Sequence, residues 1–114
     1  MALGMEKLEN LELLFREKVK RVIDNMERQN WSIRVIWGKR TEEENLLLVQ
    51  QGVASRESKH LDGRAVDLID RKIGYVHDRT HPFYRDLEKF AKEQGLKWGG
   101  DFSGRWDPCH IEMP

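Results

Sequence analysis

The first residue that could carry chemistry is a carboxylate placed where an apolar side chain is expected. Segment 64–69, Arg-Ala-Val-Asp-Leu-Ile, predicts a strand with Asp67 at its centre, and Ala65 and Ile69 are its neighbours on the same side. Burying an ionised carboxylate is costly unless a cation pairs with it. An arginine or a metal ion could be that cation, so Asp67 predicts either an internal ion pair or a metal centre.

Two histidines favour the metal centre. His60 lies in the polar segment before this strand, where Gly63 and Ala65 are small enough for the backbone to close around an ion. His110 lies on the polar face of a predicted C-terminal strand. Two imidazoles and one carboxylate form the ligand set of a catalytic zinc, whose fourth position stays open for water. His60, Asp67 and His110 are therefore the candidate metal ligands.

Other residues of ligand type are interpreted differently. Cys109 precedes His110 on the same strand and must face the other side, so we interpret it as a core thiol. His77 and His81 have the spacing of a helical zinc motif, but Pro82 disfavours a shared helix face, and we expect loop or capping histidines.

Arg40 follows a predicted strand that ends at Gly38, and it precedes a predicted helix. The residues alone favour an ordinary surface cation at this junction. At the mouth of a site, the same side chain could instead bind a substrate carboxylate or carbonyl.

The elements that must position these residues follow from hydrophobic spacing and capping. Apolar residues that advance by threes and fours predict a helix from about 5 to 29, with Leu14 on its buried face. Thr41 followed by three glutamates predicts a second helix start, and Pro82 predicts a third. Strands are expected at 32–37, 64–69 and 109–113, with a short strand or turn at 98–100. The result is a set of helices packed on a small, largely antiparallel sheet.

Composition narrows the possible functions. The chain has 114 residues with 20 Lys+Arg and 20 Asp+Glu, divided equally between its halves, which disfavours a nucleic-acid partner. A single domain over 1–114 is expected from this length. One cysteine excludes an internal disulfide, and neither a membrane span nor a signal peptide is visible, so synthesis in the cytoplasm is expected.

Several segments together resemble one family. Segment 58–67, Ser-Lys-His-Leu-Asp-Gly-Arg-Ala-Val-Asp, matches the pattern Ser-x-His-x-x-Gly-x-Ala-x-Asp of zinc peptidoglycan peptidases related to D-alanyl-D-alanine carboxypeptidases. Segment 38–41 resembles the family's Gly-x-Arg-Ser/Thr segment, and the Gln-Gly at 51–52 resembles the end of the helix that follows. Segments 98–101 and 107–110 resemble its Trp-Gly-Gly-Asp and acid-x-x-His segments. The resemblance covers residues from about 30 to 114.

The resemblance implies an α+β fold of the Hedgehog/DD-peptidase-like type, with zinc held by His60, Asp67 and His110. Asp107 would be the catalytic base, and Arg40 would bind the substrate and the transition state. Ser58 would support the ligands without binding the metal. Aspartate at position 107, where members that cut D-Ala-D-Ala carry glutamate, implies cleavage between L-Ala and D-Glu of the peptidoglycan stem peptide.

The expected protein is therefore a monomeric phage or prophage endolysin that acts on the bacterial cell wall. Arg40, Arg64 or Arg105 could orient the D-Glu carboxylate, and the sequence does not decide among them. Two alternatives stay open. One is a D-alanyl-D-alanine carboxypeptidase or dipeptidase, and the other is a non-catalytic zinc-binding domain of the same fold, as in Hedgehog proteins.

Overall fold

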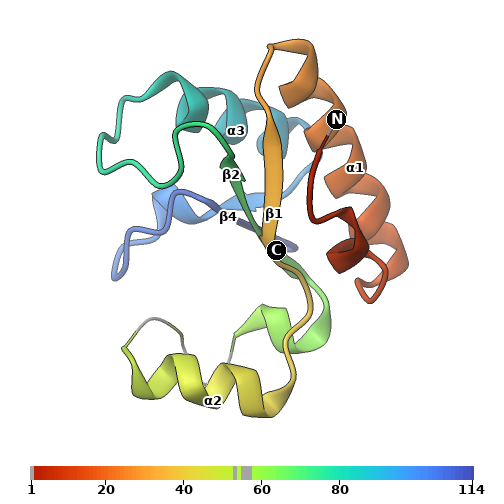
Figure 1. Ribbon diagram of the computed structural model, residues 1–114, viewed down its shortest axis with the longest axis vertical. Coiled ribbons are helices and arrows are strands. Elements are labelled where there is room, and N and C mark those ends of the chain that lie inside the picture. The colour runs from red at the N-terminus through yellow and green to blue at the C-terminus, as the bar shows by residue number, and fades with distance from the viewer. Residues whose placement is uncertain (1, 53, 55–57) are drawn as a thin grey trace.

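The protein is built on one four-stranded antiparallel sheet with the strand order β1-β2-β4-β3. The computed structural model describes residues 2–52, 54 and 58–114. In chain order the elements, where η marks a short 3-10 helix, are η1 (Met5–Leu8), α1 (Leu13–Arg28), β1 (Ile33–Trp37), α2 (Glu42–Gln50), η2 (Lys59–Asp62), β2 (Ala65–Asp70), α3 (Pro82–Glu93), β3 (Lys97–Trp98), η3 (Gly99–Asp101) and β4 (His110–Glu112) (Figure 1). The predicted fold class is confirmed.

The core lies between the sheet and helices α1 and α3. Val66 and Leu68 on β2 and Ile111 on β4 are fully buried and belong to one cluster with the buried faces of both helices. Since successive strand residues point to opposite faces, Asp67 and His110 project from the other face of the sheet. The core and the candidate metal ligands are thus on opposite sides of β2 and β4.

The predicted helix over 5–29 is wrong in its first part. Helix α1 begins only at Leu13, because Glu12 has an extended backbone, caps the helix through its side chain, and donates its N–H to the carbonyl of Gly63. Leu8 and Leu11 are buried as predicted, but they reach the core from η1 and a turn. Leu14, expected on the buried face, is 57% exposed.

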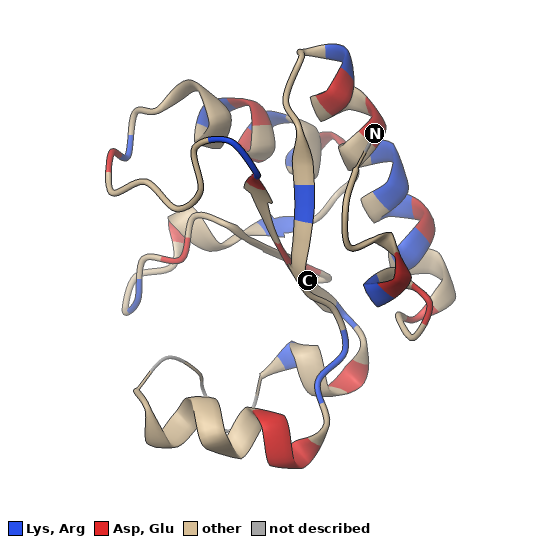
Figure 2. Ribbon diagram, in the orientation of Figure 1, with Lys and Arg blue, Asp and Glu red and all other residues tan. Residues whose placement is uncertain are grey.

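Helix α2 stands apart from the other helices (Figure 1). The predicted cap is confirmed, since Thr41 and Glu44 form a reciprocal capping box at its start. Figure 2 shows acidic residues at this end of α2, whereas α1 and α3 carry both signs of charge. Within the described residues, Asn45 is the only buried residue of α2, and it is polar.

Helix α3 begins where the sequence predicts it. His81 caps α3 by accepting the N–H of Phe83 at 3.1 Å, and Pro82 is the first helical residue, as expected. The polar segment expected before β2 contains η2, and residues 53 and 55–57 lie outside the described residues. No described helix is long and apolar enough to cross a membrane.

Candidate metal centre

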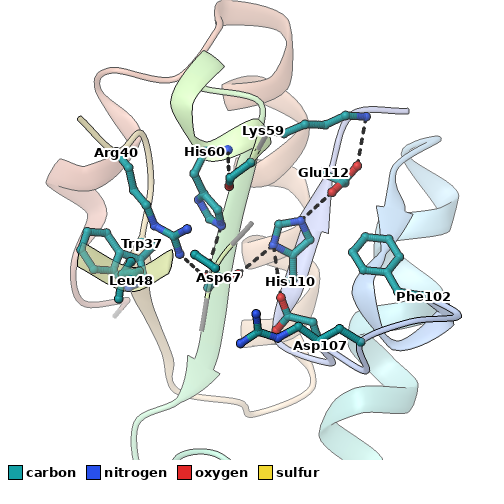
Figure 3. A pocket seen from close by; sticks show the side chains of 13 residues that line it. Trp37, Arg40, Leu48, Lys59, His60, Asp67, Phe102, Asp107, His110 and Glu112 are labelled. Carbon is teal, nitrogen blue, oxygen red and sulfur yellow. Dashed lines mark hydrogen bonds and ion pairs between the residues drawn. The ribbon is translucent and has the colours of Figure 1, made fainter. Parts of the chain in front are cut away.

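Three side chains meet on the face of the sheet opposite the core. Nε2 of His60 lies 3.3 Å from Oδ2 of Asp67, and Nδ1 of His110 lies 3.0 Å from Oδ1 of the same carboxylate. One ligand atom from each residue lies within 4.8 Å of the other two. The structure thus brings together the three residues selected from the sequence, with spacing that could hold one metal ion (Figure 3).

Strand register and a short helix hold these three residues in place. Asp67 on β2 pairs directly with His110 on β4, so the sheet itself sets their separation. His60 lies on η2, where the hydroxyl of Ser58 accepts the His60 N–H at 3.2 Å. Gly63 ends η2 in the left-handed region, at φ 69°, and turns the chain into β2.

Each histidine ring has one nitrogen engaged away from Asp67. Nδ1 of His60 is 2.9 Å from the carbonyl oxygen of Gly38, and Nε2 of His110 is 2.7 Å from Oε1 of Glu112. The opposite nitrogen of each ring faces the Asp67 carboxylate. This donor set fits zinc, which takes imidazole nitrogen and carboxylate oxygen and leaves one position open in catalytic sites.

The polar contacts shift the ionisation of the cluster. Burial by itself would raise the pKa of the Asp67 carboxyl, but hydrogen bonds and charge from His110 and His60 hold it well below its usual range. Burial also opposes the charged form of His110, yet Asp67 and Glu112 together raise its pKa to about 9. Asp67 is therefore a fully ionised anion around which nitrogen donors gather.

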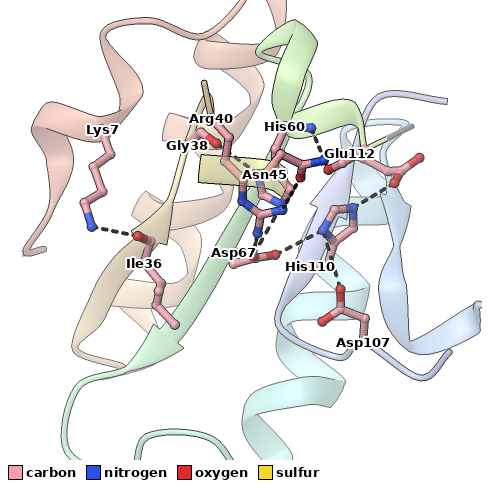
Figure 4. A network of polar contacts seen from close by, with 11 residues as sticks. Lys7, Ile36, Gly38, Arg40, Asn45, His60, Asp67, Asp107, His110 and Glu112 are labelled. Carbon is pink, nitrogen blue, oxygen red and sulfur yellow. Dashed lines mark hydrogen bonds and ion pairs between the residues drawn. The ribbon is translucent and has the colours of Figure 1, made fainter. Parts of the chain in front are cut away.

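Arg40 is buried, so the surface position favoured by the residues alone is wrong. Only 6% of it is exposed, its guanidinium lies over the ring of Trp37, and Nη2 is 3.4 Å from Oδ2 of Asp67. Nη1 donates to Oδ1 of Asn45 on α2 at 3.3 Å (Figure 4). The carboxylate of Asp67 thus pairs with an arginine and also faces the two histidines that could bind a metal with it.

Asp107 stands beside the cluster. Its Oδ2 lies 3.7 Å from Nδ1 of His110, and 40% of its side chain is exposed. Burial, and next the negative charge of Asp67, raise the pKa of the Asp107 carboxyl. A carboxyl in this position can exchange a proton with a molecule bound next to His110.

Gly99 allows the backbone of Asp107 and the side chain of His110 to lie close to segment 98–101. A Cβ atom at Gly99 would overlap the carbonyl oxygen of Asp107 and would lie 2.8 Å from Cβ of His110. The Asp107 N–H donates to the Gly99 carbonyl at 3.1 Å, and Nε1 of Trp98 donates to the carbonyl of Pro108 at 2.8 Å. The segment 98–101 therefore supports the backbone that carries Asp107 and His110.

The three candidate ligands line one cavity of about 410 Å³ together with Arg40, Ser58, Asp107 and Glu112. Beyond the site residues already described, its wall includes apolar side chains and two further cations, namely Trp37, Leu48, Ala54, Phe102, Lys59 and Arg105. Cys109 lies outside it, is 4% exposed, and belongs to the core as expected. Burial raises the pKa of its thiol to about 12, which keeps it protonated.

Three residues at the site were not selected from the sequence. Asn45 contacts Arg40, while Glu112 and Lys59 form a chain of contacts that ends on His110. Glu112 alternates with His110 on the polar face of the last strand, which was a usable signal. Nothing in the spacing of Asn45 or Lys59 distinguishes either from a solvated helix residue.

A family model described as D-alanyl-D-alanine carboxypeptidase matches residues 52–113. No curated protein matches the chain. Among solved structures, the Serratia marcescens L-Ala D-Glu endopeptidase ChiX is similar with a TM-score of 0.72 and 24% identity, over 100% of this chain and 90% of that one.

Two further structures share the fold. The LD-carboxypeptidase LdcB has a TM-score of 0.67 and 15% identity, over 90% of this chain and 58% of that one. The vancomycin resistance D,D-pentapeptidase VanY, solved as a variant in complex with Zn(II), has a TM-score of 0.63 and 16% identity, over 92% of this chain and 75% of that one.

Proposed function

Because the chain belongs to the D-alanyl-D-alanine carboxypeptidase family, we propose that it is a zinc peptidase that hydrolyses the L-Ala–D-Glu bond of peptidoglycan stem peptides. The observation that carries the proposal is the cluster of His60, Asp67 and His110 with Asp107 beside it in one cavity. Two points support the choice of bond: the aspartate at position 107, and the similarity in fold to an L-Ala D-Glu endopeptidase.

Nε2 of His60, the carboxylate of Asp67 and Nδ1 of His110 would hold the zinc ion. When bound, zinc supplies a Lewis acid that polarises the scissile carbonyl and lowers the pKa of a neighbouring water. Two neutral imidazoles and one carboxylate leave the ion with net positive charge, which that chemistry requires.

Asp107 acts as the general base. Its carboxylate takes a proton from the attacking water while the water oxygen bonds to the L-Ala carbonyl carbon, and the same carboxyl then protonates the departing D-Glu nitrogen. A raised pKa suits this double role, since the carboxyl must hold the proton between the two steps. The partial exposure of Asp107 toward the cavity leaves room for the substrate.

We assign two arginines, Arg40 and Arg105, to two different negative charges of the substrate. Arg40 is held by Trp37, Asn45 and Asp67, and we assign to it the stabilisation of the negative charge that develops on the carbonyl oxygen. Arg64 pairs with Glu12 and does not line the cavity, whereas Arg105 does. Arg105 is therefore the cation assigned to the free carboxylate of D-Glu.

Two substitutions separate binding of the metal from catalysis. His60→Ala should lose both zinc and activity. Asp107→Asn should keep zinc but lower kcat by about 100- to 10,000-fold, the usual contribution of a general base. Zinc content by mass spectrometry and hydrolysis of purified peptidoglycan check both. An Asp107→Asn protein with near-normal turnover would refute the assigned base.

Analysis of the muropeptides released by the parent protein identifies the bond. New products with N-terminal D-Glu are expected. Release of D-Ala instead would show a carboxypeptidase of the same family, and intact muropeptides with bound zinc would show a non-catalytic domain. With the first outcome, the role we propose is that of a monomeric phage or prophage endolysin that acts on the bacterial cell wall.

A further inference from the structure

We propose that Glu112 and Lys59 are positioning residues that make Nδ1 the metal-binding atom of His110. The inference rests on the proposed function only in requiring that the cluster binds a divalent metal. It makes no use of the bond that is cleaved. Figure 3 shows the three side chains in a row along one wall of the cavity.

The contacts between these three side chains are short, and both carboxylate oxygens of Glu112 have a partner. Nε2 of His110 is 2.7 Å from Oε1 of Glu112, and Oε2 of Glu112 is 3.0 Å from Nζ of Lys59. Lys59 also donates to the carbonyl of Met113 at 2.6 Å. Only 13% of the Glu112 side chain is exposed, so little water competes for its oxygens. Charged hydrogen bonds of this kind are about twice as strong as neutral ones.

An ionised carboxylate only accepts hydrogen bonds, so Nε2 of His110 must be the donor. Nδ1 also faces a carboxylate, that of Asp67 at 3.0 Å, so both ring nitrogens can donate while no metal is bound. A metal ion at the cluster would take the place of the proton on Nδ1, and the remaining N–H of the neutral ring would lie on Nε2, where Glu112 accepts it. Glu112 thus selects the tautomer in which His110 can bind a metal at the cluster, and it increases the basicity of the ligating nitrogen.

The two histidines of the cluster are held in opposite ways. His60 has Nδ1 on the neutral carbonyl of Gly38 and turns Nε2 to the cluster, whereas His110 has Nε2 on a carboxylate and turns Nδ1. Because Lys59 directly precedes His60, the Lys59–Glu112 ion pair also links the segment carrying one ligand to the strand carrying the other.

The test compares Glu112→Ala, Glu112→Gln, Lys59→Met and the double variant Lys59→Met/Glu112→Ala. Zinc affinity is measured by competition with a chelator, and circular dichroism checks folding. Glu112→Ala should weaken zinc binding by about 10- to 100-fold. Glu112→Gln, which keeps an acceptor for the N–H, should lose less. Lys59→Met should weaken binding, and the double variant should be no weaker than Glu112→Ala, because both act through one contact.

Nitrogen-15 NMR of the histidine rings in the zinc-bound protein gives a second readout. The His110 resonances should show zinc on Nδ1 and a proton on Nε2 in the parent and in Glu112→Gln, with Nε2 ligation appearing in Glu112→Ala. Glu93→Ala, which removes an exposed glutamate on α3, is the matched control and should change neither readout.

Two results would overturn the inference: a folded Glu112→Ala that binds zinc as tightly as the parent, or losses from Lys59→Met and Glu112→Ala that simply add. A parent protein that binds no zinc would overturn the proposed function as well. A parent that binds zinc but cleaves no stem peptide would remove the proposed function alone.

Discussion

The cations around the cavity differ in how far their charge is already neutralised. Arg40 contacts Asp67, and Lys59 contacts Glu112, so each is matched with a carboxylate of the site. Arg105 is exposed and forms no ion pair with any carboxylate in the described part of the chain. An arginine without such a partner at the edge of a cavity is free to bind a carboxylate of the substrate.

Arg105→Gln should therefore raise KM by about 2- to 5-fold for stem peptides with a free D-Glu α-carboxylate. Peptides in which that carboxylate is amidated should be cut with unchanged KM, because they present no charge to Arg105. Steady-state kinetics on the two synthetic peptides checks this. Arg64→Gln, which removes a cation paired with Glu12 instead, is the control. Equal effects of Arg105→Gln on both peptides would argue against carboxylate recognition.

Residue types and spacing were sufficient to select His60, Asp67 and His110, which the structure brings together, because a carboxylate inside an apolar strand is unusual in itself. They were not sufficient for Arg40, whose burial depends on stacking against Trp37 and on contact with Asn45 from another element. They did not select Glu112, although it alternates with His110 on the last strand, and they did not reveal its ion pair with Lys59, which comes from a distant segment. Contacts between segments are set by packing, which a single sequence does not display.

One buried carboxylate ties the end of β2 to the residue before β1. Asp70 at the end of β2 is 3% exposed and accepts N–H groups from Ser32, Lys72 and Ile73 at 2.8, 2.8 and 3.2 Å. Burial alone would raise the pKa of Asp70, but these three hydrogen bonds lower it below its ordinary value. Asp70 thus fixes both the turn after β2 and the start of β1.

The depressed pKa gives Asp70 a stabilising effect that is complete above the ordinary aspartate value of about 4 and is lost as the pH falls through the lower folded value. Asp70→Asn should reduce the free energy of unfolding by about 1–3 kcal/mol at pH 7. The difference from the parent should shrink toward pH 3. Urea unfolding across this range measures it, with the exposed Asp24→Asn as control. A constant difference at all pH values would contradict the ionised role.

At the scale of elements, the sequence predicted β1, β2, β4 and the three main helices of the described chain, left a strand or a turn open at 98–100, and merged η1 with α1. The spacing of Leu8 and Leu11 continues that of the helix, and both are buried as such spacing suggests. The interruption comes from Glu12, whose N–H bonds to Gly63 rather than to its own helix. Periodicity reports which residues face the core, and it does not report whether the backbone between them is continuous.

At the scale of the whole molecule, the hydrophobic core and the cavity lie on opposite faces of the sheet. The inner face of the sheet packs against α1 and α3, while the cavity opens on its outer face beside α2 and η2. Lysines, arginines and acidic residues are distributed over the elements of the molecule, consistent with its zero net charge (Figure 2). Substitutions in the helical core should therefore change the free energy of unfolding with little effect on the site.

Leu87→Ala, in the buried face of α3, should lower the free energy of unfolding by about 2–5 kcal/mol and leave zinc affinity unchanged. Leu14→Ala, at the exposed position on α1, should change it by less than about 0.5 kcal/mol. Equilibrium urea unfolding of both variants checks the pair. A comparable loss in Leu14→Ala would contradict its exposed position, and weaker zinc binding by folded Leu87→Ala would contradict the separation of core and site.

Gly99 has no side chain, and the carbonyl of Asp107 and the side chain of His110 occupy the space where one would lie. Any Cβ there would displace the Asp107 carbonyl or the His110 side chain. In the design or directed evolution of this peptidase, glycine must therefore be kept at position 99, as must the three residues that could hold a metal. The freedom to vary lies instead at exposed positions such as Leu13 on α1, far from that contact in the chain and open to solvent.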